Sequence, residues 1–280
     1  MRRTVLLIAA LLVACAGTQP TPEQRAVMLV DKGQNGEAIR VLSDYLKQHP
    51  DALKERRLLI RIIALTGDLG RAAAEAEQLA KYLPSGDPSP WIEMGHAYEL
   101  AHRYDEALSM YDRAAQVAPK DAAGPKEGGL RAARWGEVEL AEPRLEEAAR
   151  RAPSDAEVWH ALGVVRLKLR DLPGAVVAYR SGLRADPRAL ENRIGLATVA
   201  VMRDDAPAAL QQYDAIIAAR PRVADAHLGR SWALLRMGRL DAAAEALRDA
   251  ERLGASPRAV RAQKRLLARL RSASEEQRNR

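Results

Sequence analysis

Six prolines recur along this chain at an almost constant interval. Successive members are 34, 35, 34, 34 and 34 residues apart: Pro50, Pro84, Pro119, Pro153, Pro187 and Pro221. Each follows a stretch with helical apolar periodicity, and because proline cannot continue a helix, each marks the end of one. The composition also favours helix over sheet, since the chain is rich in Ala, Leu and Arg and contains no Phe. The interval therefore predicts an all-α chain of repeated units that bury their apolar faces by stacking.

The clearest unit, residues 91–119, reads WIEMGHAYELAHRYDEALSMYDRAAQVAP. It resembles the tetratricopeptide repeat, whose pattern W-x₂-L-G-x₂-Y, A-x₃-F and P is met by Trp91, Met94, Gly95, Tyr98, Ala107, Tyr111, Ala114 and Pro119. The resemblance implies a right-handed superhelical solenoid of about seven helix-turn-helix repeats with a C-terminal capping helix. Repeats are expected over residues 22–52, 53–87, 88–121, 122–155, 156–189, 190–223 and 224–257, a basic capping helix over 258–271, and a flexible tail over 272–280.

The fourth repeat departs from the pattern. Its first helix contains Gly124, Gly128 and Gly129, and Pro125 stands where Trp is usual. Glycine in a helix costs about 1 kcal/mol relative to alanine. We therefore expect the array to be least stable in this repeat.

The N-terminus has the pattern of an export signal. Arg2 and Arg3 precede an apolar run over residues 5–13, which ends in Leu12-Val13-Ala14-Cys15. This resembles the lipobox of bacterial lipoproteins. The resemblance implies a signal peptide over 1–14, lipidation at Cys15, a tether over 15–21 and anchoring at the periplasmic face of the outer membrane of a Gram-negative bacterium. The alternatives are an ordinary signal peptide with a cysteine near its cleavage site, or an uncleaved anchor.

The family resemblance also implies where a partner binds. First helices line a concave groove through the second, fifth, ninth, twelfth and thirteenth positions of each repeat. The N-terminal repeats place charged groups there: Lys54, Arg57, Arg61, His96 and Glu99. The C-terminal repeats place mainly apolar ones: Val164, Leu167, Ile194, Val201, Met202, Leu228, Trp232 and Leu235. Such a strip suits an amphipathic helix or an extended peptide. For Trp232 the alternative is packing beneath the capping helix. The Asn that chaperone-binding members need at the ninth position is missing from all seven repeats.

Other function classes find little support in the sequence. It contains no HExxH, GxSxG, SxxK or phosphate-binding GxxxxGK motif, and its five histidines show no metal-ligand spacing. We therefore expect no enzyme activity, no cofactor, no metal and no small-molecule substrate. The net charge of +7 is mild, and with an export signal it does not indicate nucleic-acid binding. The six positive residues of the capping helix suit either an acidic partner or simply a soluble end to the array.

We therefore expect a membrane-anchored periplasmic scaffold that binds proteins. In architecture, length and lipobox it resembles the pilotins, tetratricopeptide lipoproteins that help a type IV pilus secretin assemble in the outer membrane. The alternative is an adaptor for cell-wall hydrolases or proteases, or for gliding or envelope complexes. Motifs of a repeat do not identify its partner.

Overall fold

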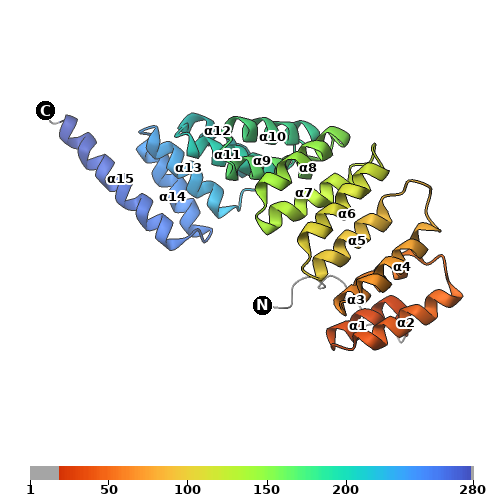
Figure 1. Cartoon of the computed structure of the whole chain (residues 1–280). Coiled ribbons are helices and arrows are strands. Elements are labelled where there is room, and N and C mark those ends of the chain that lie inside the picture. Colours follow the sequence, from red (N-terminus) through yellow and green to blue (C-terminus); the bar gives the residue numbers. More distant parts are fainter. Residues whose placement is uncertain (1–18, 279–280) are drawn as a thin grey trace. The chain divides into compact units, whose positions relative to one another are not determined.

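The computed structural model describes residues 19–278, and every regular element within them is a helix (Figure 1). The predicted signal peptide and Cys15 lie outside the described residues. The helices are α1 (Pro22–Asp31), α2 (Asn35–Gln48), α3 (Leu53–Leu65), α4 (Leu69–Ala80), α5 (Ser89–Leu100), α6 (Tyr104–Val117), α7 (Ala123–Trp135), α8 (Val138–Arg151), α9 (Ala156–Lys168), α10 (Leu172–Ala185), α11 (Leu190–Met202), α12 (Ala206–Ala219), α13 (Ala224–Arg236), α14 (Leu240–Arg252) and α15 (Pro257–Arg278). The predicted all-α fold class is confirmed.

The chain forms two compact units, which we call the N-terminal unit (up to Ala132) and the C-terminal unit (from Ala133). The division falls within α7, in the repeat that the sequence predicts to be the least stable. In the N-terminal unit, α1 packs on α2, α3 on α4 and α5 on α6. In the C-terminal unit, α9 packs on α10, α11 on α12 and α13 on α14, and α15 covers α14 and part of α13. No helix among the described residues is both long and apolar enough to cross a membrane.

Glycines of first helices make room for tyrosines of three second helices, α6, α10 and α12. The Tyr179 side chain of α10 is 1% exposed and is wedged between Gly163 of α9 and Gly195 of α11. A Cβ at either glycine would lie 2.4 Å from the ring, well inside van der Waals contact. Gly95 stands in the same relation to Tyr111 in the N-terminal unit. The glycines of the repeat pattern are therefore the positions against which its tyrosine rings pack.

The periodic prolines also act as hydrogen-bond acceptors. Six residues after four of them, a side chain near the start of the next first helix donates an N–H to the proline carbonyl. These pairs are Arg56 Nη2 to Pro50 at 3.1 Å, Trp159 Nε1 to Pro153 at 2.9 Å, Arg193 Nη2 to Pro187 at 3.2 Å and His227 Nε2 to Pro221 at 2.8 Å. Because a helix end leaves carbonyls without intrahelical partners, these bonds join one repeat to the next. Six residues after Pro119 stands Pro125, whose side chain has no N–H to donate.

The capping helix is longer than the sequence predicts. The expected end at residue 271 is wrong, because α15 continues to Arg278. The segment from 272 onward contains neither glycine nor proline, and the Ser272 hydroxyl donates to the Ala268 carbonyl within the helix. With no helix breaker in the segment, the i to i−4 ladder simply propagates.

Candidate functional site

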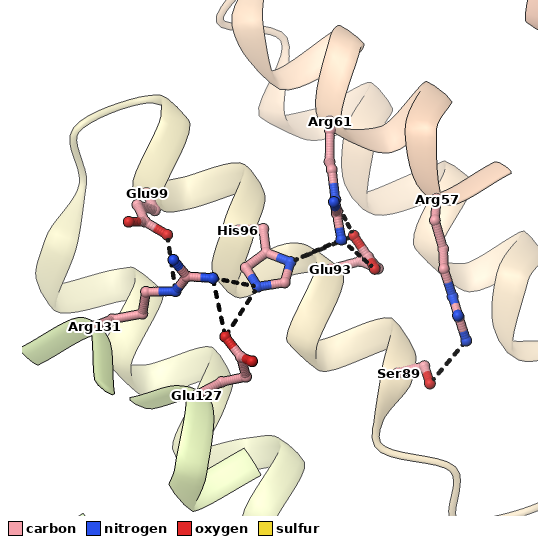
Figure 2. Close-up of polar contacts among 8 residues, drawn as sticks. All are labelled: Arg57, Arg61, Ser89, Glu93, His96, Glu99, Glu127 and Arg131. Carbon is pink, nitrogen blue, oxygen red and sulfur yellow. Dashed lines mark hydrogen bonds and ion pairs between the residues drawn. The ribbon is translucent and has the colours of Figure 1, made fainter. Parts of the chain in front are cut away.

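The first helices of the N-terminal unit share a network of charged side chains, which we call the polar ladder (Figure 2). It crosses from α3 through α5 to the part of α7 that belongs to this unit. Its members are Arg61, Glu93, His96, Glu99, Glu127 and Arg131.

The ladder begins with a bidentate ion pair. Arg61 Nε and Nη2 donate to the two carboxylate oxygens of Glu93 at 2.7 and 2.9 Å. Glu93 is only 4% exposed, so its charge requires a close partner. Paired N–H groups of one guanidinium match a carboxylate in geometry as well as in charge. Arg61 therefore neutralises a buried carboxylate on the next first helix.

His96 stands at the centre of the ladder. Its Nδ1 lies 3.5 Å from Glu93 Oε2, and its Nε2 lies 3.5 Å from Glu127 Oε2. Two guanidinium nitrogens lie close to the same ring, Arg61 Nη2 at 3.2 Å from Nδ1 and Arg131 Nη2 at 3.4 Å from Nε2. Both ring nitrogens are thus engaged by neighbouring side chains of the ladder.

The far end of the ladder is held by Arg131. Its Nη2 donates to Glu127 Oε2 at 3.0 Å, and its Nε lies 3.4 Å from Glu99 Oε2. Just outside the ladder, Arg57 Nη2 donates to the Ser89 hydroxyl at 3.1 Å. Figure 2 shows these contacts joining consecutive first helices.

The environment shifts the pKa values of Glu93, His96 and Glu127 toward their charged forms. Burial raises the pKa of Glu93, but hydrogen bonds from His96 and Arg61 outweigh it and the net pKa is lowered. Burial lowers the pKa of His96, but its hydrogen bonds to Glu127 and Glu93 outweigh that effect and the net pKa is raised. The hydrogen bond from His96, with the charge of Arg131, lowers the pKa of Glu127 to about 2.

The ladder satisfies its own charges. With His96 protonated, three cations face three carboxylates, so little net charge is left for a partner. The sequence predicts Arg57, Arg61 and His96 as partner-binding residues, and the structure gives each of them a partner within the chain. Within residues 19–278, no group of three or more His, Cys, Asp or Glu side chains is arranged to hold a metal ion.

The C-terminal unit presents apolar groups on the corresponding helices. Ile194 and Met202 of α11 are each 44% exposed, and the exposed Thr198 lies between them at four-residue spacing. Residues spaced by four share one face of a helix. We call this face of α11 the α11 strip. It leaves two large apolar side chains in water.

Three further predicted groove residues are half-buried and support the packing of the unit. Leu167 of α9 packs against the cluster that contains Tyr179, and Val201 of α11 packs against a cluster of alanines from α11, α12 and α13. Val164 of α9 is half-buried as well. These side chains are only partly available to a partner.

The last repeat corrects part of the prediction. Leu235 is 3% exposed and packs with Leu234 and Leu267, because α15 covers this side of α13, so it cannot line a groove. Leu228 also packs against a cluster that includes Val260 of α15. Trp232 is half-buried in the alanine cluster beside Val201, and not in either cluster that includes α15 residues.

Sequence reasoning missed half of the polar ladder. Glu93, Glu127 and Arg131 fall outside the groove positions of the repeat pattern, so they were not predicted as site residues. A signal was present, however: Arg61 and Glu93 are 32 residues apart, and so are Glu99 and Arg131, which is close to one repeat. Opposite charges spaced by one repeat length are therefore candidates for pairs between stacked first helices.

Comparison with protein families gives one matching description. A family model described as tetratricopeptide repeat matches residues 24–88, 127–189 and 194–270, which is most of the chain. A comparison with curated proteins found no match.

Solved structures with similar folds share little sequence with this chain. YrrB, described as a tetratricopeptide-repeat protein with an unusual peptide-binding site, is 19% identical with a TM-score of 0.59, over 69% of this chain and 99% of YrrB. The C-terminal part of a repeat-containing protein from Cytophaga hutchinsonii is 14% identical with a TM-score of 0.62, over 84% of this chain and 97% of that one. MamA is 17% identical with a TM-score of 0.53, over 57% and 93% of the respective chains. At these identities the likeness concerns the fold.

Proposed function

Because this chain belongs to the tetratricopeptide-repeat family, we propose that it is a scaffold that binds a protein partner and catalyses no reaction. Repeats of this kind suggest protein interaction, and the finer question is which surface the partner uses. The polar ladder is a poor candidate, since its charges are already paired with one another. A partner would have to break those pairs to use them.

The α11 strip carries the proposal. Ile194 and Met202 are each 44% exposed on α11, which is a first helix. The family resemblance implies that first helices line the binding groove. Covering two such side chains removes apolar area from water, which favours association. Half-buried Trp232, in the same unit, adds an aromatic group of the type enriched at binding hot spots. The partner segment is an amphipathic helix or an extended peptide with apolar anchors. YrrB, described as having a peptide-binding site, supports this mode by analogy of fold.

The scaffold is anchored to a membrane through Cys15, at the periplasmic face of the outer membrane. The support is the order of sequence features: Arg2 and Arg3, the apolar run over 5–13, then Ala14 and Cys15. Replacing Cys15 with Ser is expected to abolish labelling of the protein by a radioactive fatty acid. A wild-type protein without fatty acid would contradict the anchor.

For the process, we favour assembly of an envelope machine such as a type IV pilus secretin. Architecture and lipobox support this choice by analogy. An adaptor for cell-wall hydrolases or proteases, or for gliding or envelope complexes, is the alternative. Both use the same binding surface, so identifying the bound partner decides between them.

The test is affinity capture from detergent-solubilised membranes with two matched double variants. Ile194→Gln with Met202→Gln removes the α11 strip. Leu140→Gln with Val177→Gln replaces two apolar residues of α8 and α10 that are 41% and 56% exposed. All four positions are solvent-exposed, so both variants are expected to fold.

Partner recovery should fall at least tenfold for the strip variant and stay near the wild-type level for the control variant. Equal recovery by both would refute binding at the α11 strip. A recovered secretin supports the pilus assignment, and a recovered hydrolase or protease supports the alternative.

A further inference from the structure

Helix α15 carries six basic residues over 258–271, and the structure divides them into two groups. Two of them are tied to α14: Lys264 Nζ lies 2.7 Å from Glu251 Oε2, and Arg271 Nη2 lies 2.8 Å from Asp241 Oδ1. These pairs lie at the border between α15 and the body of the C-terminal unit. Lys264 and Arg271 therefore help to hold α15 against α14.

The other four arginines are exposed and form no ion pair with the part of the chain that the structure describes. We call them the arginine stripe: Arg258, Arg261, Arg265 and Arg269. Their spacing of three, four and four residues keeps them on one side of a helix, within an arc of about 80° and a length of about 16 Å. The stripe is therefore a straight row of guanidinium groups.

The stripe lies on the side of α15 roughly opposite the body of the unit. Val260 and Leu267, which are 2% and 8% exposed, mark the face of α15 that packs on α13 and α14. By helical geometry that face lies roughly opposite the stripe. A flat surface can therefore approach all four arginines without meeting the rest of the unit.

Solubility alone does not require this arrangement. A capping helix needs a polar outer face, which charges of either sign supply. Residues 257–274 contain no Asp or Glu, so the face has one sign along the stripe, and acidic residues follow only at Glu275 and Glu276 in the last turns of α15. Like charges four residues apart repel each other on a helix, so the row weakens α15 unless an anion meets it.

We propose that the arginine stripe binds the phosphate groups of an anionic phospholipid surface. Guanidinium groups bind phosphate oxygens through paired N–H donors, and four in a row suit an array of lipid headgroups. The arc holds no large apolar side chain, so the helix lies on the headgroups through charge and does not insert. This inference depends neither on the lipid anchor nor on the protein partner proposed above.

The experiment is vesicle co-sedimentation of the full chain at low salt, with phosphatidylcholine vesicles and with vesicles containing 25% phosphatidylglycerol. Every protein carries Cys15→Ser, so no acyl chain contributes to binding. The stripe variant is R258Q/R261Q/R265Q/R269Q. The control variant, R203Q/R220Q/R222Q/R239Q, removes four exposed arginines elsewhere in the C-terminal unit and so has the same net charge.

We expect phosphatidylglycerol to strengthen binding of the unsubstituted protein and of the control variant. Each basic residue near an anionic surface strengthens binding roughly fivefold. The stripe variant, which lacks four of them, should therefore bind the phosphatidylglycerol vesicles roughly 10²- to 10³-fold more weakly than the unsubstituted protein. Equal losses in both variants, or no dependence on phosphatidylglycerol, would overturn the proposal. So would binding to soluble polyglutamate as tight as to the anionic vesicles, which would assign the stripe to an acidic protein instead.

Discussion

The packing of Tyr179 between two first helices makes Gly163→Ala an informative substitution. In a solvated helix, alanine in place of glycine stabilises by about 1 kcal/mol. Here the added Cβ would lie 2.4 Å from the Tyr179 ring, about 1 Å inside ordinary contact. The ring has little room to move away, because α11 lies so close on its other side that a Cβ at Gly195 would also be 2.4 Å from the ring.

The two effects oppose each other, and the clash is the larger. Overpacking in a close-packed core costs about 1–3 kcal/mol, and a ring confined on both sides belongs at the upper end of that range. After subtracting the gain in helix propensity, we expect Gly163→Ala to lower the free energy of unfolding by about 2 kcal/mol. Gly36→Ala is the control: it is also helical and has no atom within 4 Å of the added Cβ, so it should stabilise by up to about 1 kcal/mol.

Urea unfolding followed by far-ultraviolet circular dichroism measures both effects. The midpoint for Gly163→Ala should fall by roughly 1 M, with the slope unchanged. In a Tyr179→Leu background the same substitution should cost clearly less, because the atoms it meets are gone. A Gly163→Ala protein as stable as the wild type would refute the close packing of Tyr179 between Gly163 and Gly195. An equal loss of stability in both backgrounds would refute it as well.

Three further substitutions and one exchange measurement test other parts of the structure. Since the pKa of Glu127 is lowered from 4.5 to about 2, its contribution to the free energy of unfolding is present above pH 4.5 and is lost as the pH falls toward 2. Urea titrations across that range should show that Glu127→Gln removes about 1 kcal/mol of this acid dependence, a value that allows for solvent screening. The pKa of His96 is raised above 6.5, so its contribution to the free energy of unfolding is present below pH 6.5 and is lost as the pH rises through the folded-state pKa. His96→Gln should therefore make the free energy of unfolding less dependent on pH in that range. Trp159→Phe removes the N–H donated to Pro153 and should cost about 0.5–1.5 kcal/mol in thermal unfolding. Hydrogen exchange should show the lowest protection over residues 122–142, and protection there equal to that of neighbouring repeats would contradict the weak fourth repeat.

Local chemistry allowed the sequence to determine the helices. A proline every 34 or so residues ends a helix wherever it stands, and apolar periodicity between two prolines marks the pair of helices that lies there. Gly163 stands at the glycine position of the repeat pattern, and the structure shows that this position leaves room for the Tyr179 ring. The end of α15 was less predictable, because no residue between 271 and 278 breaks the helix.

Only the tertiary structure decided which side chains are available to a partner. Leu235 and Met202 belong to the same predicted groove, yet α15 buries the first and nothing in the described chain covers the second. Arg61 was predicted to be free for a partner and is instead paired with Glu93, 32 residues away. The physical reason is that helix formation depends on neighbours in sequence, whereas burial and charge pairing depend on which helix the stacking places alongside.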